Sequence, residues 1–297
     1  MKAPDKKDQI VLSISGGAGK NIMATAVVEA IKKQFPNSKI VIVSPWHKEV
    51  WANNPNVSFT TDINKDFSFY KKHILNTDSL FLSNDPYLAE QFVYKDKNLI
   101  QVWCEMNGIK YNGELPKLYF TEEENKKMKD KLPKDKKLFF IQTSGGAPIQ
   151  KHPISWMRDM PLPFAQKVVN YMNSKGYRTI HLRRADQYPL ENEIWIPMTT
   201  REVLCSVQFA DKSLFIDSVA QHASAAVGKQ AVVTWIGNKP KVFGYDLHIN
   251  IAPNTPNKFR HYIDSYFEKF DIAGRLHECP YNTNEIFDFE EIKKALE

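Results

Sequence analysis

Short apolar segments alternate along this chain with segments of helical character. Residues 214–216 are apolar throughout and 231–236 nearly so, which is typical of parallel strands buried on both faces. The stretch between them predicts a short helix. Asp217 or Ser218 can cap its first free N–H groups, and Gly228 can adopt the left-handed conformation that ends a helix. This order predicts half of a βαβ unit.

The same alternation extends over most of the chain. The predicted strands are residues 10–15, 40–43, 79–82, 138–143 and 178–183. The predicted helices are residues 21–34, 86–94, 121–131, 163–175 and 200–210, and Thr199 with Glu202 forms a capping box for the last of these. Strands that alternate with helices predict parallel sheets, so the fold class is α/β. Each half opens with a strand and a Gly-Gly turn, which indicates two Rossmann-like domains.

The length of 297 residues suits two domains, each large enough to bury its own core. The exposed helix predicted at 121–131 ends before Pro133, and we place the domain boundary there. The expected N-terminal domain is therefore 1–132 and the C-terminal domain 133–255. Residues 256–297 carry further helical patterns, near 257–270 and near 288–296.

The net charge of +6 comes mostly from one segment. Residues 126–137 hold seven lysines against two aspartates. Such a run is typical of a solvated linker, and contact with an anionic membrane surface is the alternative interpretation. Because the basic excess is not spread along the chain, no groove for nucleic acid is expected.

Three further observations narrow the class of protein. The polar N-terminus precedes no apolar segment that resembles a signal peptide or membrane helix, which favours a cytoplasmic location. Cys104, Cys205 and Cys279 are far apart and in no metal-ligand spacing, which argues against a structural zinc site. The sequence contains no Asp-x-Asp pair, so no bridging metal and no cofactor are expected.

Glycines follow the first predicted strand, at Gly16, Gly17 and Gly19, where backbone can approach a ligand. A Walker A loop would need Ser or Thr in place of Asn21, and a glycine in place of the isoleucine at 14. A dinucleotide fingerprint would need a small residue in place of Ile22 and an acid at the end of the second strand, where the chain has serine. Neither a kinase nor a dinucleotide enzyme is favoured.

In an open parallel sheet, ligands bind outside the carboxyl ends of the strands, where helix N-termini attract anions. Asp217, Ser218 and His222 stand at such a position. The alternative is that Asp217 and Ser218 only cap the helix and that His222 is a hydrogen-bonded structural residue.

The stretch FIDSVAQHASAAVGKQAVVTWIGNKP resembles the nucleotide-sugar segment of the heptosyltransferase-like glycosyltransferases of family 9, whose pattern is roughly D-[ST]-G-x-x-H-x-x-A-A-x-G. The matching residues are Asp217, Ser218, His222, Ala225, Ala226 and Gly228. Val219 replaces the usual glycine, which affects how closely backbone can approach a donor. The resemblance implies that Asp217, Ser218 and His222 contact that donor.

Residues 13–57 resemble the opening segment of the same family, with one departure. The family carries Gly-Asp in the glycine turn, the Asp being the proposed general base, and this chain has Gly19-Lys20. A lysine is a base near neutral pH only if its pKa is depressed by several units. Lys20 is interpreted as a phosphate or acceptor contact, or as an exposed lysine at a helix start. Asp85 and His47 follow strands at the same edge and are the alternative bases.

Two further motifs point to the donor diphosphate. Lys151 and Trp156 resemble the family 9 K-x-W segment, which implies that Lys151 meets the donor phosphates. Residues 181–186 resemble the H-x-R-R-x-D motif of several fucosyltransferase families, which implies the same for Arg184. An arginine pair, Arg183 and Arg184, can instead form surface ion pairs.

Together the resemblances imply a GT-B type fold, with two Rossmann-like domains facing a cleft. The first domain, 1–132, would bind the acceptor and the second, 133–255, the nucleotide-sugar donor, and the helices of 256–297 would pack back on the first domain. The implied activity is metal-independent, inverting transfer of a sugar from a nucleotide-diphosphate donor to a glycan or lipopolysaccharide-like acceptor. Lys151, Arg183 or Arg184 and the helix N-terminus at 218 would balance the leaving-group charge. The alternatives are a GDP-fucose-type transferase and a nucleotide-sugar-binding protein without turnover. A lipopolysaccharide-like acceptor would place the protein peripherally at the inner membrane face.

Overall fold

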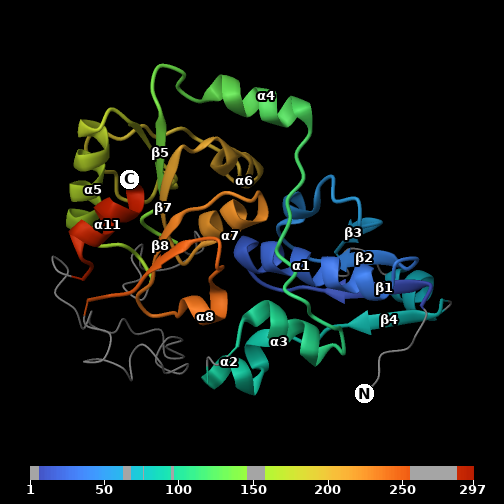
Figure 1. The fold of residues 1–297 in the computed structure, drawn as a ribbon. Helices are drawn as coiled ribbons and strands as arrows, with labels where there is room; N and C mark the ends of the chain where they lie inside the picture. The colour runs from blue at the N-terminus through green and yellow to red at the C-terminus, as the bar shows by residue number, and fades with distance from the viewer. Residues whose placement is uncertain (1–6, 63–67, 76, 95–96, 146–157, 255–285) are drawn as a thin grey trace. The chain divides into compact units, whose positions relative to one another are not determined.

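The computed structural model describes residues 7–62, 68–75, 77–94, 97–145, 158–254 and 286–297 (Figure 1). Its contacts divide the chain into two compact units, Met1–Thr121 (unit 1) and Glu122–Glu297 (unit 2). Each unit is an α/β structure built on one parallel sheet. No helix in the described ranges is long and apolar enough to cross a membrane.

Unit 1 contains a four-stranded parallel sheet in the order β3-β2-β1-β4. Its strands are β1 (Gln9–Ser13), β2 (Lys39–Val43), β3 (Phe59–Thr61) and β4 (Ser79–Leu82). In the register, Ile10 lies between Ile40 of β2 and Leu80 of β4. Because β1 is central and covered on both faces, its apolar residues are almost completely buried, as the sequence pattern predicted.

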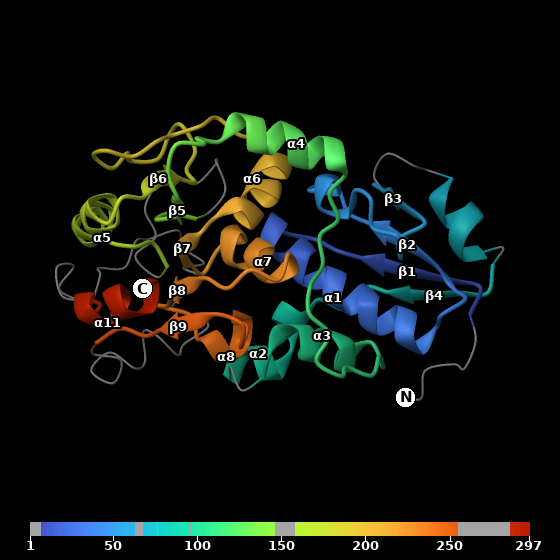
Figure 2. The same ribbon diagram turned by 45° about the horizontal axis from the view of Figure 1, so that its top comes forward.

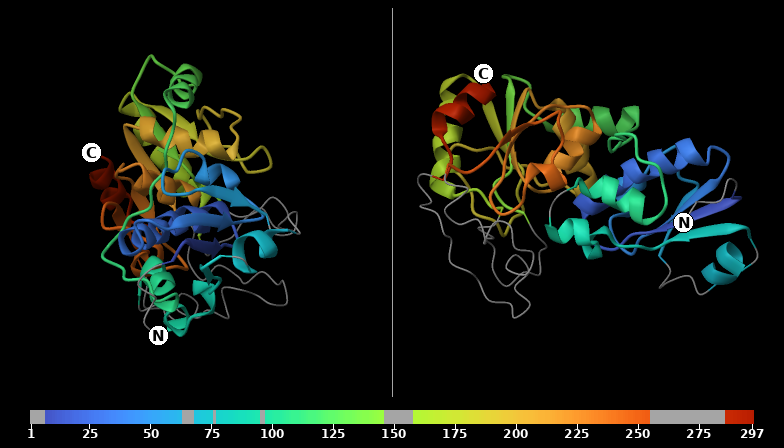
Figure 3. Two further views of the ribbon diagram at one scale, coloured as in Figure 1. Left: turned by 90° about the vertical axis from the view of Figure 1, so that its right-hand side faces the viewer. Right: turned by 60° about the horizontal axis from the view of Figure 1, so that its bottom comes forward.

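Helices cover both faces of this sheet (Figure 3). The helical elements are α1 (Ala18–Gln34), η1 (Lys48–Trp51), the π-helical η2 (Lys71–Leu75), η3 (Pro86–Leu88), α2 (Glu90–Tyr94) and α3 (Leu99–Met106). Helix α3 packs against α1, and Phe69 beside η2 packs on Val11 and Val41. Helix α1 begins three residues before the predicted start, and α3 was not predicted.

Unit 2 contains a five-stranded parallel sheet in the order β6-β5-β7-β8-β9 (Figure 2). Its strands are β5 (Leu138–Ile141), β6 (Arg178–His181), β7 (Lys212–Ile216), β8 (Val232–Thr234) and β9 (Ile249–Ile251). Strand β9 was not predicted, because its three residues carry too little pattern.

The helices in the described part of unit 2 are α4 (Glu122–Lys131), α5 (Leu162–Ser174), α6 (Thr200–Ser206), η4 (Val207–Phe209), α7 (Val219–Ala226), α8 (Pro240–Phe243) and α11 (Phe289–Leu296). The predicted capping box at α6 is confirmed, since Thr199 and Glu202 bond each other's backbone N–H groups. The contact-based division places α4 in unit 2, where it packs on α6 through the Arg201–Glu124 ion pair of 2.7 Å.

The C-terminal helix corrects one expectation. We expected the helices of 256–297 to pack on the first domain, but α11 packs on unit 2 (Figure 2). Ile292 and Leu296 are buried with Phe164 of α5 and Leu214 of β7 in one core cluster. The amphipathic face of α11 finds its apolar partner there. The helix predicted near 257–270 lies outside the described residues.

Candidate functional site

Each sheet has a topological switch point beside its first strand. There, one connection leads to a strand on one side of the first strand and a later connection leads to a strand on its other side. In unit 1 the strands beside β1 are β2 and β4, and in unit 2 the strands beside β5 are β6 and β7. Ligands of open parallel sheets bind outside the carboxyl ends of the strands at such a point. The two switch points are therefore the places to compare with the residues predicted from the sequence.

At the switch point of unit 2, the turn after β5 meets the start of α7. A methyl group added at Gly145 would lie 3.0 Å from Ser218 Oγ and 3.3 Å from Arg158 Nε, so the glycine allows a close approach. The Gly145 N–H donates to buried Asp159 at 2.9 Å, which fixes the turn. Ser218 and a permanently charged guanidinium thus lie beside the same glycine, an arrangement suited to an anion.

The N-terminus of α7 differs from the prediction in one respect. Ser218 is the N-cap residue, but its side chain caps no backbone N–H. The side chain of Asp217 accepts a hydrogen bond from Asn238 Nδ2 instead of capping. Gln142, directly after β5, accepts a bond from the Ala220 N–H at 3.3 Å. At the other end Gly228 adopts φ +70°, so the predicted left-handed end of the helix is confirmed.

His222 points into the interior of unit 2. Its side chain is 4% exposed, and Nδ1 lies 2.8 Å from the Tyr245 hydroxyl. Burial, together with nearby His248, lowers the pKa of His222 to about 3, so the ring is neutral. Burial also lowers the pKa of His248, whose Nε2 lies 2.9 Å from the Gln221 carbonyl oxygen. The buried ring contrasts with the expectation of a His222 open to a diphosphate, because the side chain is packed against Tyr245.

A buried polar chain follows β6. His181 Nε2 lies 2.9 Å from Thr143 Oγ1, and its Nδ1 is bonded to Glu193. Glu193 also accepts a bond from Arg183 Nε at 2.7 Å. Burial by itself would raise the pKa of the Glu193 carboxyl, but the hydrogen bonds from His181, the Leu190 N–H and Arg183 outweigh it and hold that pKa below its usual range.

The arginine pair of the H-x-R-R-x-D motif divides between two environments. Arg183 is paired with Glu193 and stacks 4.9 Å from the centre of the Trp195 ring. Arg184 pairs with Asp186 at 2.9 Å, and both side chains are partly open to solvent. Lys151 and Trp156 lie outside the described residues.

At the switch point of unit 1, Lys20 and Asp85 form an ion pair of 2.6 Å between Nζ and Oδ2. The lysine side chain is 8% exposed and the aspartate 28%. Ser15 Oγ lies 3.3 Å from the same carboxylate oxygen, and the Tyr87 N–H donates to Oδ1 at 3.0 Å. The ammonium also lies 4.8 Å from the centre of the Tyr87 ring and 5.6 Å from that of Trp103. Lys20 is therefore a buried partner of Asp85, and the alternative of an exposed lysine is wrong.

The glycine turn brings backbone to this pair. Gly16 adopts φ +105°, and a methyl group there would lie 3.1 Å from Lys20 Cδ. Gly17 is the N-cap residue of α1, with no side-chain cap, and Gly19 falls in the first turn. Completely buried Asn21 donates to the Gly17 carbonyl oxygen at 3.1 Å, which holds the turn against α1.

The second base candidate of the sequence lies on a different loop. His47 follows β2 with a left-handed φ of +58°, and its Nδ1 lies 3.1 Å from Glu49. Asp85, by contrast, follows β4 and shares the switch point with Lys20. The geometry thus favours Asp85 over His47 as the carboxylate or base of unit 1.

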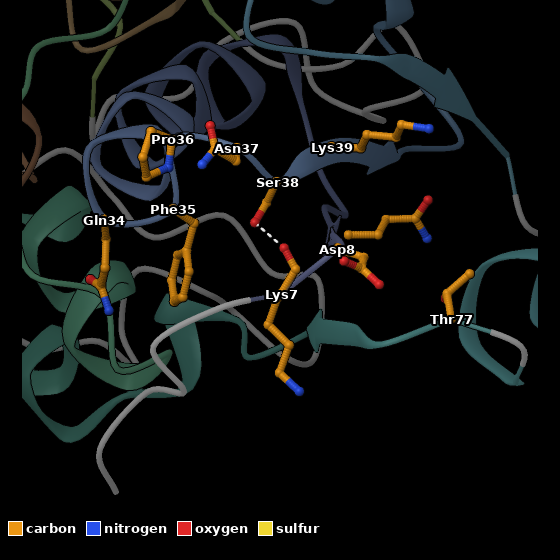
Figure 4. Close-up of a pocket in the computed structure, with 10 residues that line it drawn as sticks. Lys7, Asp8, Gln34, Phe35, Pro36, Asn37, Ser38, Lys39 and Thr77 are labelled. Atoms are coloured by element: carbon orange, nitrogen blue, oxygen red, sulfur yellow. Dashed lines mark hydrogen bonds between the residues drawn. The ribbon is translucent and has the colours of Figure 1, made fainter.

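A hollow of about 410 Å³ lies at the opposite, amino edge of this sheet (Figure 4). Residues before β1 and between α1 and β2 line it, among them Lys7, Phe35, Asn37 and Lys39. In the close-up Lys7 and Lys39 extend away from each other. Because helix N-termini and strand carboxyl ends face the other edge, this hollow is not the switch-point site.

The sequence pattern missed four residues that shape these sites. They are Asn21, Gln142, Arg158 and Glu193. Each belongs to no recognised motif, and each acts through a partner that is brought close only by the sheet. Gln142 falls within the predicted strand 138–143, and its polar side chain after the apolar run 138–141 was the available signal for it.

No protein-family model and no curated protein matches the sequence. Solved structures do match the fold. The glycosyl transferase family 9 protein from Veillonella parvula superimposes with a TM-score of 0.70 at 16% identity, covering 99% of this chain and 98% of its own. The ADP-heptose LPS heptosyltransferase II of E. coli gives 0.67 at 11% identity, covering 97% and 98%. The E. coli heptosyltransferase WaaC with ADP gives 0.55 at 11% identity, covering 86% and 99%.

These likenesses show that the chain has the fold found in family 9 glycosyltransferases. The resemblance noted in the sequence is confirmed at the level of fold. With identities this low, the activity has to be argued from the residues at the switch points.

Proposed function

We propose that the protein is a glycosyltransferase that moves a sugar from a nucleoside diphosphate donor to a hydroxyl of a glycan or lipopolysaccharide-like acceptor. The observation that carries the proposal is the fold shared with a family 9 glycosyltransferase over 99% of the chain. The motif at 217–228 supports it, because that segment begins at the switch point of unit 2. Neighbours of the same fold were solved with ADP and with ADP-2-deoxy-2-fluoro heptose, which favours an ADP-sugar as donor.

In this proposal unit 2 binds the donor diphosphate. Ser218 and Arg158 supply a hydroxyl and a fixed positive charge beside Gly145. The free N–H groups of the first turn of α7 add a partial positive charge. Lys151 and Arg184 are the further candidates for phosphate contacts. Arg183 and His222 instead hold neighbouring structure, since Glu193 and Tyr245 already engage them.

Unit 1 supplies the base. The acceptor oxygen bonds to the anomeric carbon while the bond from that carbon to the diphosphate oxygen breaks, and the hydroxyl proton passes to a carboxylate. Asp85 is the carboxylate beside the glycine turn, oriented by Lys20 and Ser15. A single displacement of this kind inverts the anomeric configuration. The cations named above balance the charge of the departing nucleotide without a metal, so chelation by EDTA should leave turnover unchanged.

A second function has one observation in its favour. Asp85 already accepts bonds from Lys20, Ser15 and the Tyr87 N–H, which leaves its oxygens less accessible to an acceptor hydroxyl. A protein that binds nucleotide-sugars without turnover would retain the donor site of unit 2 and have no need of a base.

Calorimetry with ADP, GDP and UDP identifies the nucleotide, and GDP selectivity would favour the fucosyltransferase-type alternative. Nucleotide release from the matching sugar donor, with and without acceptor extracts, then separates transfer from binding. Asp217→Asn should reduce transfer by roughly 10-fold at unchanged thermal stability if the carboxylate contacts the donor. Tight nucleotide binding with no release under any condition would leave the binding protein as the function.

A further inference from the structure

Trp46 is an exposed indole at the carboxyl edge of the unit 1 sheet. It follows β2 by three residues, and 59% of its surface is open. The other tryptophans of unit 1, Trp51 and Trp103, are 3% and 1% exposed. A single exposed aromatic residue is common on protein surfaces. For Trp46, the hydrogen bonds that fix its backbone indicate a role in ligand binding.

A buried polar network fixes the backbone that carries the indole. Ser44 is 1% exposed, and its Oγ lies 2.6 Å from the Trp46 carbonyl oxygen and 3.1 Å from Asn21 Oδ1. The same Asn21 oxygen accepts a bond from Trp51 Nε1 at 3.1 Å. The next residue, His47, adopts a left-handed φ of +58°, a conformation that is unfavourable for a non-glycine residue. Strained backbone of this kind persists where surrounding structure enforces it, and it is concentrated at ligand sites.

The network also links the indole to the Lys20–Asp85 pair. Asn21 is the residue after Lys20 and bonds the Gly17 carbonyl oxygen at 3.1 Å. Strand β1 lies between β2 and β4, so the strands that lead to Trp46 and to Asp85 are two spacings, or about 10 Å, apart. An apolar aromatic face and a hydrogen-bonding carboxylate therefore stand along one edge of one rigid sheet.

This combination matches the chemistry of a sugar ring. A pyranose has an apolar C–H face that packs on an aromatic ring, and hydroxyls around its rim that bond to carboxylates and serine hydroxyls. We propose that unit 1 binds a saccharide, with one ring stacked on Trp46 and a neighbouring hydroxyl directed toward Asp85 and Ser15. The inference rests on the proposed function only in identifying this saccharide as the acceptor. Binding itself needs no donor and no turnover.

The test measures saccharide binding in the absence of any nucleotide. The full-length protein is applied to an array of immobilised bacterial glycans, and the saccharide bound best is titrated in solution. Trp46→Ala should weaken that binding about 5- to 10-fold, whereas Trp46→Phe keeps a stacking ring and should stay within about 3-fold. The blue shift of tryptophan emission on binding should disappear in Trp46→Phe although the saccharide still binds.

Tyr70→Ala is the matched control, because Tyr70 is another exposed aromatic of unit 1, at 51%, and it precedes β4 instead of following a strand. Three outcomes would overturn the inference: no glycan bound by the wild type, equal binding by Trp46→Ala, or a loss of ADP affinity in Trp46→Ala that identifies the indole as a nucleobase contact. The failure of this inference can be told apart from the failure of the proposed function. If glycan binding depends on Trp46 but no sugar is transferred, the saccharide site holds and only the proposed function fails.

Discussion

Lys20 stands in the glycine turn where the family that this sequence resembles carries an aspartate, and Asp85 forms an ion pair with it. The family's proposed base belongs to the glycine turn itself, whereas here the carboxylate comes from the loop after β4 and a lysine occupies the turn. The pair keeps a negative group at the switch point and neutralises the buried ammonium. At this scale the site keeps a carboxylate, which is now paired with an ammonium.

The first prediction concerns variants in which the carboxylate is removed from position 85 or moved to position 20. Removing Asp85 alone would leave a buried cation without its partner, so the matched control is the double variant Lys20→Met with Asp85→Asn, which removes both charges. That variant should lose about 100-fold or more in kcat, as expected for loss of a general base. Lys20→Asp with Asp85→Asn returns a carboxylate to the turn and should recover at least about 10-fold in a transfer assay. Wild-type turnover in the uncharged control would eliminate Asp85 as the base.

The second prediction concerns acid stability and the neutral His222. Its pKa of about 3 in the folded chain lies below the usual histidine value of 6.5, so below pH 6.5 the unfolded chain binds a proton that the folded chain does not. The stability contribution is complete above pH 6.5 and is lost as the pH falls from 6.5 toward 3, by about 1 kcal/mol per pH unit. Urea unfolding of wild type at pH 7.5, 6 and 5 measures this slope.

His222→Gln should flatten the slope, because the variant side chain takes up no proton in the unfolded chain. His248 acts in the same direction, because burial lowers its pKa as well, so part of the slope should remain in His222→Gln. An unchanged slope in that variant would show that other groups govern the acid response.

Among the elements, the second half of α4 and the turn after it, residues 126–137, carry most of the excess positive charge. Two of the lysines pair with Asp130, and Lys131 pairs with Glu202 at the start of α6. The ends of α4 are thus tied to unit 2 by ion pairs, which explains why it belongs there although its sequence is highly polar. Its one buried apolar residue is Met128.

The third prediction tests whether this segment contacts substrate. Lys127, Lys136 and Lys137 are exposed, and replacing all three by Gln should leave turnover on a soluble acceptor within about twofold, because surface changes rarely exceed about 0.5 kcal/mol. Lys131→Gln, which breaks the pair with Glu202, is the comparison for a structural lysine and should lower the melting temperature more. A large loss of turnover in the triple variant would identify the segment as a substrate contact, and reduced sedimentation with anionic vesicles would identify it as a membrane contact.

For the whole molecule, each unit has its own hydrophobic core, so we expect the two units to unfold separately on heating. The core of unit 2 includes α5, α11 and β7, and that of unit 1 is formed by β1, β2 and their covering helices. If the donor binds unit 2, saturation with ADP stabilises that unit directly. At 100 times the dissociation constant the gain is about 2.7 kcal/mol.

The fourth prediction follows from this division. Scanning calorimetry should resolve two transitions, of which ADP raises one by several degrees. The same transition should be the acid-sensitive one, because His222 and His248 both lie in unit 2. A shift confined to the transition that acid leaves unchanged would contradict donor binding by unit 2.

The sequence by itself determined what depends on near neighbours along the chain. Apolar runs predicted β1, β2, β4 and β7, Thr199 with Glu202 predicted the start of α6, and Gly228 predicted the end of α7. These features follow from strand and helix periodicity and from caps, which involve residues at most a few positions apart. The motif at 217–228 is also local, and it pointed to family 9, whose solved structures share the fold of this chain.

Only the tertiary structure decided which distant residues meet. Lys20 and Asp85 are 65 positions apart, and no local pattern distinguishes Asp85 from other acids after strands. Other contacts also join residues that are far apart in the sequence. They are the contact of His222 with Tyr245, the position of Arg158 beside Ser218 and the packing of α11 on unit 2. The physical reason is the order of strands in each sheet, which brings loops together at its carboxyl edge and which is set by the packing of the whole unit.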